Sequence, residues 1–90
     1  MATVRLPRHL LRHVDAPDEC VAAGATVAEV IGDLERQFPG MTGYLVDDQG
    51  ALRQHVNLFI GERLIRDRRR LSDPLDADAE IYVMQALSGG

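Results

Sequence analysis

The sequence ends in Gly89 and Gly90, directly after a run of residues with the pattern of a buried strand. Glycine has no Cβ atom and populates unusual backbone angles cheaply, so two glycines in succession form a thin, mobile strip of chain. Such a strip can enter a narrow channel in another protein and present its terminal carboxylate there. The residues therefore indicate chemistry at the Gly90 carboxylate, carried out inside a partner.

Other candidate reactive residues do not combine into an enzyme site. His9, His13 and His55 lack a second set of metal ligands at suitable spacing, and we expect surface or hairpin roles for them rather than a metal site. Asp47 and Asp48 stand in a turn sequence, where aspartate bonds to the local backbone. The sequence contains neither a nucleophile–base–orienter set nor a phosphate-binding glycine loop. We expect a substrate of enzymes rather than an enzyme, with no bound cofactor.

The basic residues are concentrated between positions 66 and 70, where the chain carries four arginines. Arg66, Arg68 and Arg69 are candidates for contact with an acidic partner surface, where complementary charge mainly affects encounter rate and register. The alternative is a solvated loop balanced by nearby acidic residues such as Asp73 and Asp76. Both interpretations stay open from the sequence.

Size and charge exclude several classes of protein. The chain has 90 residues, a net charge of −4 and a pI near 5.2, which predicts one domain, 1–90, that binds neither nucleic acid nor a membrane surface. No apolar run approaches the roughly 20 residues that span a bilayer, and residues 1–7 lack a secretion signal, so we expect a cytoplasmic protein. All ten basic residues are arginine, so the chain cannot be extended through its own lysines. The single cysteine, Cys20, is expected to fill space in a strand.

An amphipathic helix is the clearest element. Thr26 and Glu29 have the spacing of a capping box, in which a hydroxyl and a carboxylate each accept from a backbone N–H of the first turn. Pro39 and Gly40 end the helix. Between them, apolar residues recur at helical spacing, and they are Val27, Val30, Ile31, Leu34 and Phe38.

Strands are expected on both sides of this helix. Before it, residues 3–6 and 10–14 read as a hairpin and 19–22 resume an extended form, so the pattern allows two or three strands. After it, 56–60, 63–65 and 80–86 read as strands. One helix can cover only one sheet face. The order predicts an α+β fold of the ubiquitin-like β-grasp type, a mixed sheet curled around one main helix, with residues 87–90 as a flexible functional tail.

The alternation in the last strands also predicts a docking surface. If the helix covers the face that bears Val56 and Leu58, then Phe59, Tyr82 and Met84 share the opposite face. An exposed apolar patch there would mark a partner site. The alternative is that the N-terminal strands or loops cover these three residues.

Three segments resemble the MoaD/ThiS family of ubiquitin-like sulfur carriers, including the carriers used in thiocarboxylate-dependent cysteine synthesis. They are residues 24–40, residues 55–61 and residues 81–90, which end in Ala-Leu-Ser-Gly-Gly. The resemblance covers most of residues 24–90. One departure is Asp78-Ala79, where such carriers often have Gly-Asp before the last strand.

The resemblance implies that the Gly90 carboxylate becomes a sulfur donor. A ubiquitin-activating-type adenylyltransferase would use ATP to form an acyl-adenylate, and sulfur would then replace AMP to leave a thiocarboxylate carried covalently at Gly90. Leu87, Ser88 and Gly89 would thread into the partner. A free carboxylate is a poor electrophile, and adenylation supplies the leaving group. A sulfur-accepting biosynthetic enzyme would then receive the tethered sulfur at high effective concentration.

Other functions stay open beside the carrier. The chain could be the small subunit of a molybdopterin-synthase-type complex, with its tail held permanently in a large subunit. It could be a protein modifier joined through Gly90 to lysines of other proteins, or an uncharged β-grasp interaction module. Stable co-purification with one catalytic partner would favour the subunit, and an amide-linked tail would favour the modifier.

Overall fold

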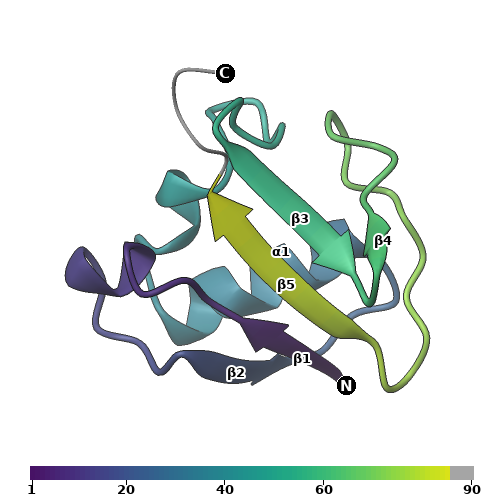
Figure 1. The fold of residues 1–90 in the computed structure, drawn as a ribbon, viewed down its shortest axis with the longest axis horizontal. Coiled ribbons are helices and arrows are strands. Elements are labelled where there is room, and N and C mark those ends of the chain that lie inside the picture. The colour runs from purple at the N-terminus through teal and green to yellow at the C-terminus, as the bar shows by residue number, and fades with distance from the viewer. Residues whose placement is uncertain (86–90) are drawn as a thin grey trace.

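A computed structural model describes residues 1–85 as a mixed sheet with one helix packed on one of its faces (Figure 1). The sheet order is β2-β1-β5-β3-β4; β1 and β5 run parallel, and the other neighbours are antiparallel. This arrangement is the ubiquitin-like β-grasp expected from the sequence. The elements are β1 (Ala2–Arg5), β2 (Glu19–Ala22), α1 (Val27–Gln37), β3 (Val56–Ile60), β4 (Arg63–Leu64) and β5 (Glu80–Gln85).

The proposed tail lies outside the described residues. The expectations for Leu87, Ser88, Gly89 and Gly90, and for Ala86 as the end of the last strand, all fall there. In the part that is described, no helix combines the length and the apolar character needed to cross a membrane.

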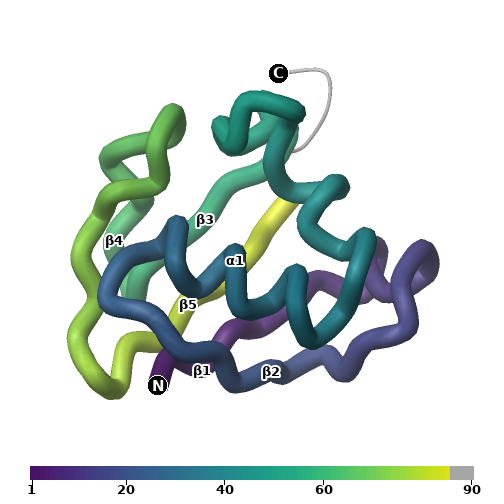
Figure 2. Tube along the Cα trace, turned by 180° about the vertical axis from the view of Figure 1, so that it is seen from behind, coloured from purple at the N-terminus to yellow at the C-terminus, as the bar shows by residue number. Residues whose placement is uncertain are grey.

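The start of α1 is held from two directions. The Thr26 hydroxyl accepts from the Glu29 N–H at 3.3 Å, which confirms half of the capping box, while the Glu29 carboxylate accepts from the N–H of Ala25 at 3.0 Å. Two further N–H groups of the first turn, those of Val27 and Ala28, donate to carbonyls in the segment between β4 and β5. Figure 2 shows this segment running beside the beginning of the helix. The long connection therefore also caps the helix.

The core lies between α1 and the inner face of the sheet. Val30 and Leu34 of the helix are fully buried, and so are Val4 and Leu58 on the facing strands. Each such side chain contributes about 1.5–3 kcal/mol by leaving water. Cys20 is buried within β2, as expected.

The expectation of a strand over residues 10–14 is wrong. Residues Leu10–Arg12 form a 3-10 turn, with the Leu10 N–H donating to the Pro7 carbonyl and the His13 N–H donating to the Leu10 carbonyl. The antiparallel partner of β1 is β2, in a register that pairs Arg5 with Glu19. Apolar residues at 10, 11 and 14 fit one helical turn as well as a partial alternation, and packing against the core selects the turn.

Candidate docking surface

The face of the sheet opposite α1 carries an apolar patch. Phe59 pairs with Tyr82 across β3 and β5, and it pairs with Leu64 across β3 and β4. Directly paired residues on antiparallel strands point to the same side of a sheet, and Met84 lies two residues beyond Tyr82 on that side. We call Phe59, Leu64, Tyr82 and Met84 the outer-face patch.

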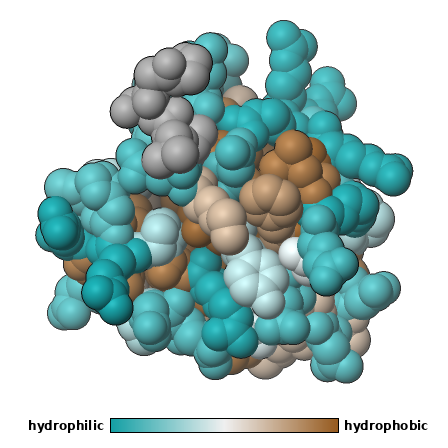
Figure 3. Space-filling view, in the orientation of Figure 1, coloured by the Kyte–Doolittle hydropathy of each residue, from teal (hydrophilic) through white to brown (hydrophobic). Residues whose placement is uncertain are grey.

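The outer-face patch is open to solvent. Leu64 is 47% exposed and Met84 is 49% exposed, while Phe59 and Tyr82 are half-buried. Figure 3 shows apolar side chains gathered on this face, within a surface that is otherwise mostly hydrophilic. The described N-terminal strands therefore do not cover Met84. Sequence reasoning missed Leu64, although a two-residue turn after Ile60 places it opposite Phe59.

Charged residues border the patch on the side of β1. The Arg5 guanidinium bridges the carboxylates of Glu19 at 2.7 Å and Glu80 at 3.3 Å, and it lies 5.8 Å from the centroid of the Tyr82 ring. The hydrogen bond to Glu80 and the charge of Glu19 raise the pKa of Arg5. The guanidinium of Arg5 therefore contacts the Tyr82 ring from the side of β1, and the three charged residues form a polar edge of the patch.

The candidate arginines have different surroundings. Arg68 is half-buried, and one of its guanidinium nitrogens donates to the carbonyls of Arg53 and Val56, at 2.8 Å each. Its other terminal nitrogen lies 3.3 Å from the side-chain oxygen of Asn57. Arg66 and Arg69 are exposed. Arg68 thus ties the loop that holds the arginines, residues 66–70, to the start of β3, while Arg66 and Arg69 are exposed to solvent.

Two aspartates shape the same loop. Asp67 accepts from the Ser72 hydroxyl and from the N–H groups of Arg70 and Arg69, which lowers the pKa of Asp67 to about 2.

Asp73 is 4% exposed and accepts from the N–H groups of Arg66 and Asp67. Burial opposes its ionisation, but these bonds and the guanidinium of Arg63 outweigh burial and lower the pKa of Asp73. Both carboxylates stabilise the loop.

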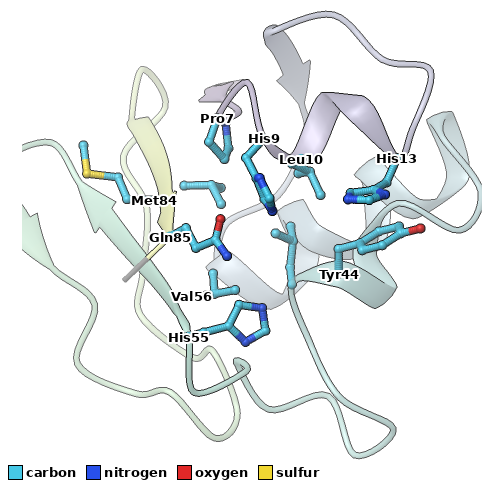
Figure 4. Close-up of a pocket in the computed structure, with 11 residues that line it drawn as sticks. Pro7, His9, Leu10, His13, Tyr44, His55, Val56, Met84 and Gln85 are labelled. Atoms are coloured by element: carbon cyan, nitrogen blue, oxygen red, sulfur yellow. The ribbon is translucent and has the colours of Figure 1, made fainter. Parts of the chain in front are cut away.

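A small pocket lies beside the end of β5. Its floor is apolar, and its rim carries His9, His13 and His55 (Figure 4). The ring centroids of His9 and His13 are 5.8 Å apart, and His13 stacks on Tyr44 at 5.3 Å. Within residues 1–85 no group of three or more His, Cys, Asp or Glu side chains is placed to hold a metal ion. The convergence of the histidines was not expected, because His55 comes from a distant segment.

The described chain ends at this pocket. Gln85 pairs with Val56 in the last rung between β5 and β3, and both residues line the pocket. The root of the proposed tail is therefore fixed by the start of β3, which Arg68 in turn holds through the Val56 carbonyl. Met84, one residue earlier, belongs both to the pocket wall and to the outer-face patch.

Comparison with known proteins identifies the family. The sequence model of the ThiS family matches residues 9–90. The chain belongs to the ThiS family. It is 28% identical over 90 residues to sulfur carrier protein CysO of Mycobacterium tuberculosis, covering 98% of this chain and 97% of that protein. The resemblance drawn from the sequence is thereby confirmed.

Two further matches place this ThiS-family chain among ubiquitin-like proteins. It matches a chain of the solved BexX/CysO complex of Amycolatopsis orientalis with a TM-score of 0.86 and 27% identity, covering 100% of both chains. It is also 30% identical over 66 residues to small archaeal modifier protein 3 of Haloferax volcanii, covering 73% of this chain and 71% of that protein. The structural match confirms the β-grasp fold.

The carboxylates whose pKa is lowered in this ThiS-family chain bond to its own backbone and side chains. The Ala23 N–H lowers the pKa of Asp33, and the Thr42 hydroxyl lowers the pKa of Glu35. Asp67 and Asp73 likewise accept hydrogen bonds within the loop between β4 and β5, and these bonds lower the pKa of each carboxyl. Such local capping explains these shifts without a reaction. The described residues that these local bonds leave unexplained are the outer-face patch, the exposed Arg66 and Arg69, and the lining of the pocket beside Gln85.

Proposed function

We propose that the chain is a sulfur carrier whose Gly90 carboxylate is activated and converted to a thiocarboxylate. The observation that carries this proposal is the match of the ThiS family through residue 90, which includes the terminal diglycine. The similar protein from Mycobacterium tuberculosis is named a sulfur carrier protein. The proposal keeps the chain as a cytoplasmic, non-enzymatic carrier that is acted on by its partners.

The chemistry needs two steps. In the first, an adenylyltransferase of the ubiquitin-activating type joins the Gly90 carboxylate to the α-phosphate of ATP and releases pyrophosphate. In the second, a sulfur nucleophile attacks the acyl carbon, AMP leaves, and the thiocarboxylate remains on Gly90. A biosynthetic enzyme then accepts the sulfur. Leu87, Ser88 and Gly89 connect the reacting atom to the folded domain and would thread into each enzyme.

The outer-face patch supports the docking part of the proposal. Phe59, Tyr82 and Met84 present an apolar surface beside the root of the tail, and exposed Arg66 and Arg69 lie in the loop that Arg68 ties to β3. The similar chain from Amycolatopsis orientalis was solved in complex with a second protein, BexX. We assign the patch to contact with the adenylyltransferase, with Arg66 and Arg69 as charged contacts and Arg68 as the residue that positions their loop.

Intact-mass measurement tests the proposed function. The full chain is incubated with ATP, sulfide and the adenylyltransferase of its source organism, and we expect a mass gain equal to the replacement of one oxygen by sulfur. Omission of ATP and deletion of Gly90 should each abolish the gain. An unchanged mass, under conditions in which the enzyme exchanges pyrophosphate with ATP in the presence of the chain, would exclude the second step. An absence of that exchange would exclude the first.

A protein modifier is the second candidate. The identity to small archaeal modifier protein 3 favours it, because a modifier uses the same activated glycine. The two functions differ in the final acceptor, which is a lysine amine in one case and a small-molecule precursor in the other. Affinity purification of the tagged chain from its source cells, followed by a search for proteins whose lysines are joined by an amide bond to Gly90, distinguishes them. Because the chain has no lysine or arginine after Arg70, the remnant left on such a lysine by trypsin would be residues 71–90.

A further inference from the structure

The pocket beside Gln85 joins residues from three separate segments. Pro7, His9, Leu10 and His13 come from the turn after β1. Tyr44 and Leu45 come from the end of a second 3-10 turn, Thr42–Tyr44, and the residue after it, and His55 precedes β3. Its volume is about 100 Å³, which suits one side chain and is too small for a nucleotide. Figure 4 shows the His9 imidazole projecting into the middle of this space, close to Gln85. All three histidines are exposed, so an incoming group can reach their ring nitrogens.

The rim of the pocket differs in charge from the rest of the molecule. The chain has 14 acidic residues and a net charge of −4, yet among residues 1–85 no acidic side chain lines the pocket. Residues 7–13 contain no acidic residue; their two histidines line the pocket, while Arg8 and Arg12 lie outside the lining. Each imidazole presents at least one N–H donor, whichever its protonation state. Below the rim, Leu10, Leu45 and Val56 are buried and form an apolar floor. These features complement a carboxylate carried on an aliphatic stem.

The position of the pocket selects the partner that would supply this carboxylate. Gly90 is the fifth residue after Gln85, and an extended residue spans at most about 3.6 Å, so a reacting Gly90 lies within roughly 18 Å of Gln85. An enzyme that acts on Gly90 must therefore place the reacting centre of its active site within that distance of the end of β5. Met84 makes the pocket continuous with the outer-face patch.

We propose that this pocket is a second docking site, in which His9, His13 and His55 receive an aspartate or glutamate side chain of the adenylyltransferase that holds the tail. This inference rests on the proposed function and adds to it a specific contact. The patch supplies apolar area, and the pocket supplies a directional anchor next to the channel that admits the tail. Such an anchor fixes the rotation of the carrier on the enzyme, so that the tail and the channel are aligned.

The test is a binding measurement with charge-reversed carriers. Full-length wild type, His9→Glu and His55→Glu are titrated against the adenylyltransferase, and Kd is measured by calorimetry. We expect each substitution to weaken binding by about tenfold, because it places two carboxylates together in one pocket. Gln54→Glu is the matched control. It changes the charge by the same amount next to His55 but outside the pocket lining, and we expect a Kd within about twofold of wild type.

A second pair of variants identifies the contact. His9→Gln and His55→Gln keep a hydrogen-bond donor and should bind within about threefold of wild type. On the enzyme, reversal to lysine of the acidic residue that enters the pocket should restore the binding of His9→Glu. Circular dichroism of each carrier checks that it is folded.

The outcomes separate this inference from the proposed function. If wild type gains sulfur at Gly90 but His9→Glu and His55→Glu bind as wild type does, the pocket proposal is wrong and the carrier function stands. If Gln54→Glu weakens binding as much as His55→Glu does, the effect is general charge steering, and the pocket proposal is again wrong. If wild type is never charged at Gly90, the proposed function itself fails.

Discussion

Phe59 and Tyr82 lie directly opposite each other on β3 and β5, on the face of the sheet that α1 leaves uncovered. Cross-strand aromatic pairs of this kind stabilise a sheet, and this one also forms the centre of an exposed surface. Leu64 extends the surface on one side and Met84 extends it toward the root of the tail. The proposed docking role fits this position, since an enzyme that binds the carrier must also receive Gly90.

The first prediction concerns Met84. We expect Met84→Ser to lower kcat/KM for adenylation by about tenfold, because the shorter polar side chain would no longer fill an apolar contact on the enzyme. Val21→Ser is the control, since Val21 is 50% exposed on the same face but lies on the edge strand β2, away from the tail. Equal activity of the two variants, with folding intact, would show that the enzyme does not use the patch. Phe59→Ser should act in the same direction, with some loss of stability because Phe59 is half-buried.

The second prediction concerns the exposed arginines. We expect Arg66→Ser combined with Arg69→Ser to lower the association rate with the adenylyltransferase and to flatten its dependence on salt, because attraction between exposed charges is screened by ions. Arg36→Ser, on the far side of the molecule in α1, should leave both quantities unchanged. Stopped-flow measurements at several salt concentrations provide the test. A wild-type rate that does not vary with salt would rule out steering.

The third prediction concerns the pKa of Asp67. The Ser72 hydroxyl is the largest cause of its lowering to about 2, so Ser72→Ala should move the pKa upward while Ser72→Thr should retain most of the shift. The group is depressed in the folded state. Its contribution to stability is therefore complete above the unfolded value of 3.8 and is lost as pH falls through about 2. Carboxyl carbon shifts followed by NMR check this, and titration near 4 in wild type would contradict it.

The fourth prediction concerns Asp73, which is buried and bonded to two backbone N–H groups and to Arg63. We expect Asp73→Ala to lower the free energy of unfolding by about 2–3 kcal/mol, because buried donors lose a charged acceptor. Asp76→Ala, at an exposed position, should change it by less than about 0.5 kcal/mol. Urea unfolding measures both.

The effect of Asp73→Ala should also depend on pH. Because the pKa of Asp73 is lowered in the folded protein, its stabilisation is complete above 3.8 and declines as pH falls below that value. The difference between wild type and variant should therefore shrink in acid. A difference that stays constant down to pH 2 would show that the charge of Asp73 is not what stabilises the loop.

The fifth prediction contrasts a glycine that precedes α1 with a glycine inside the helix. At Gly32, inside α1, an added Cβ meets no atom within 4 Å, so Gly32→Ala should stabilise the protein by about 0.5–1 kcal/mol through helix propensity. At Gly24 an added Cβ would lie 2.7 Å from the backbone nitrogen of Val30 and 2.8 Å from Glu29 Cβ. Gly24→Ala should therefore destabilise by about 1–3 kcal/mol. Thermal unfolding of the two variants should shift in opposite directions, and shifts of the same sign would contradict the packing described here.

Local patterns were sufficient for much of the fold. The helix from Val27 and the strand from Val56 to Ile60 were predicted because their apolar residues recur at a period of 3.6 or of 2 along a continuous segment. The first hairpin was predicted incorrectly for residues 10–14, since a short segment with three apolar residues fits more than one period. The strand that pairs antiparallel with β1 is β2, whose Cys20 and Ala22 are buried on the core side.

Part of the candidate site could also be predicted from local patterns, and part could not. Phe59, Tyr82 and Met84 could be placed on one face from alternation alone, because side chains of a strand alternate strictly between its two faces. Arg68 was grouped with Arg66 and Arg69 by charge, whereas its bonds to the carbonyls of Arg53 and Val56 depend on a loop returning to β3. Such contacts between a loop and an earlier strand have no periodic signal in the sequence, so they could not be predicted from it.

By itself, the amino-acid sequence determined the acidic charge, the β-grasp order of elements, the terminal diglycine and the resemblance to the ThiS family. Only the tertiary structure decided that Leu64 joins Phe59 and that His9, His13 and His55 surround one pocket beside Gln85. The physical reason is the range of the interactions. Capping, alternation and helical spacing act within a few residues, while strand register and loop packing bring together segments that the chain keeps far apart.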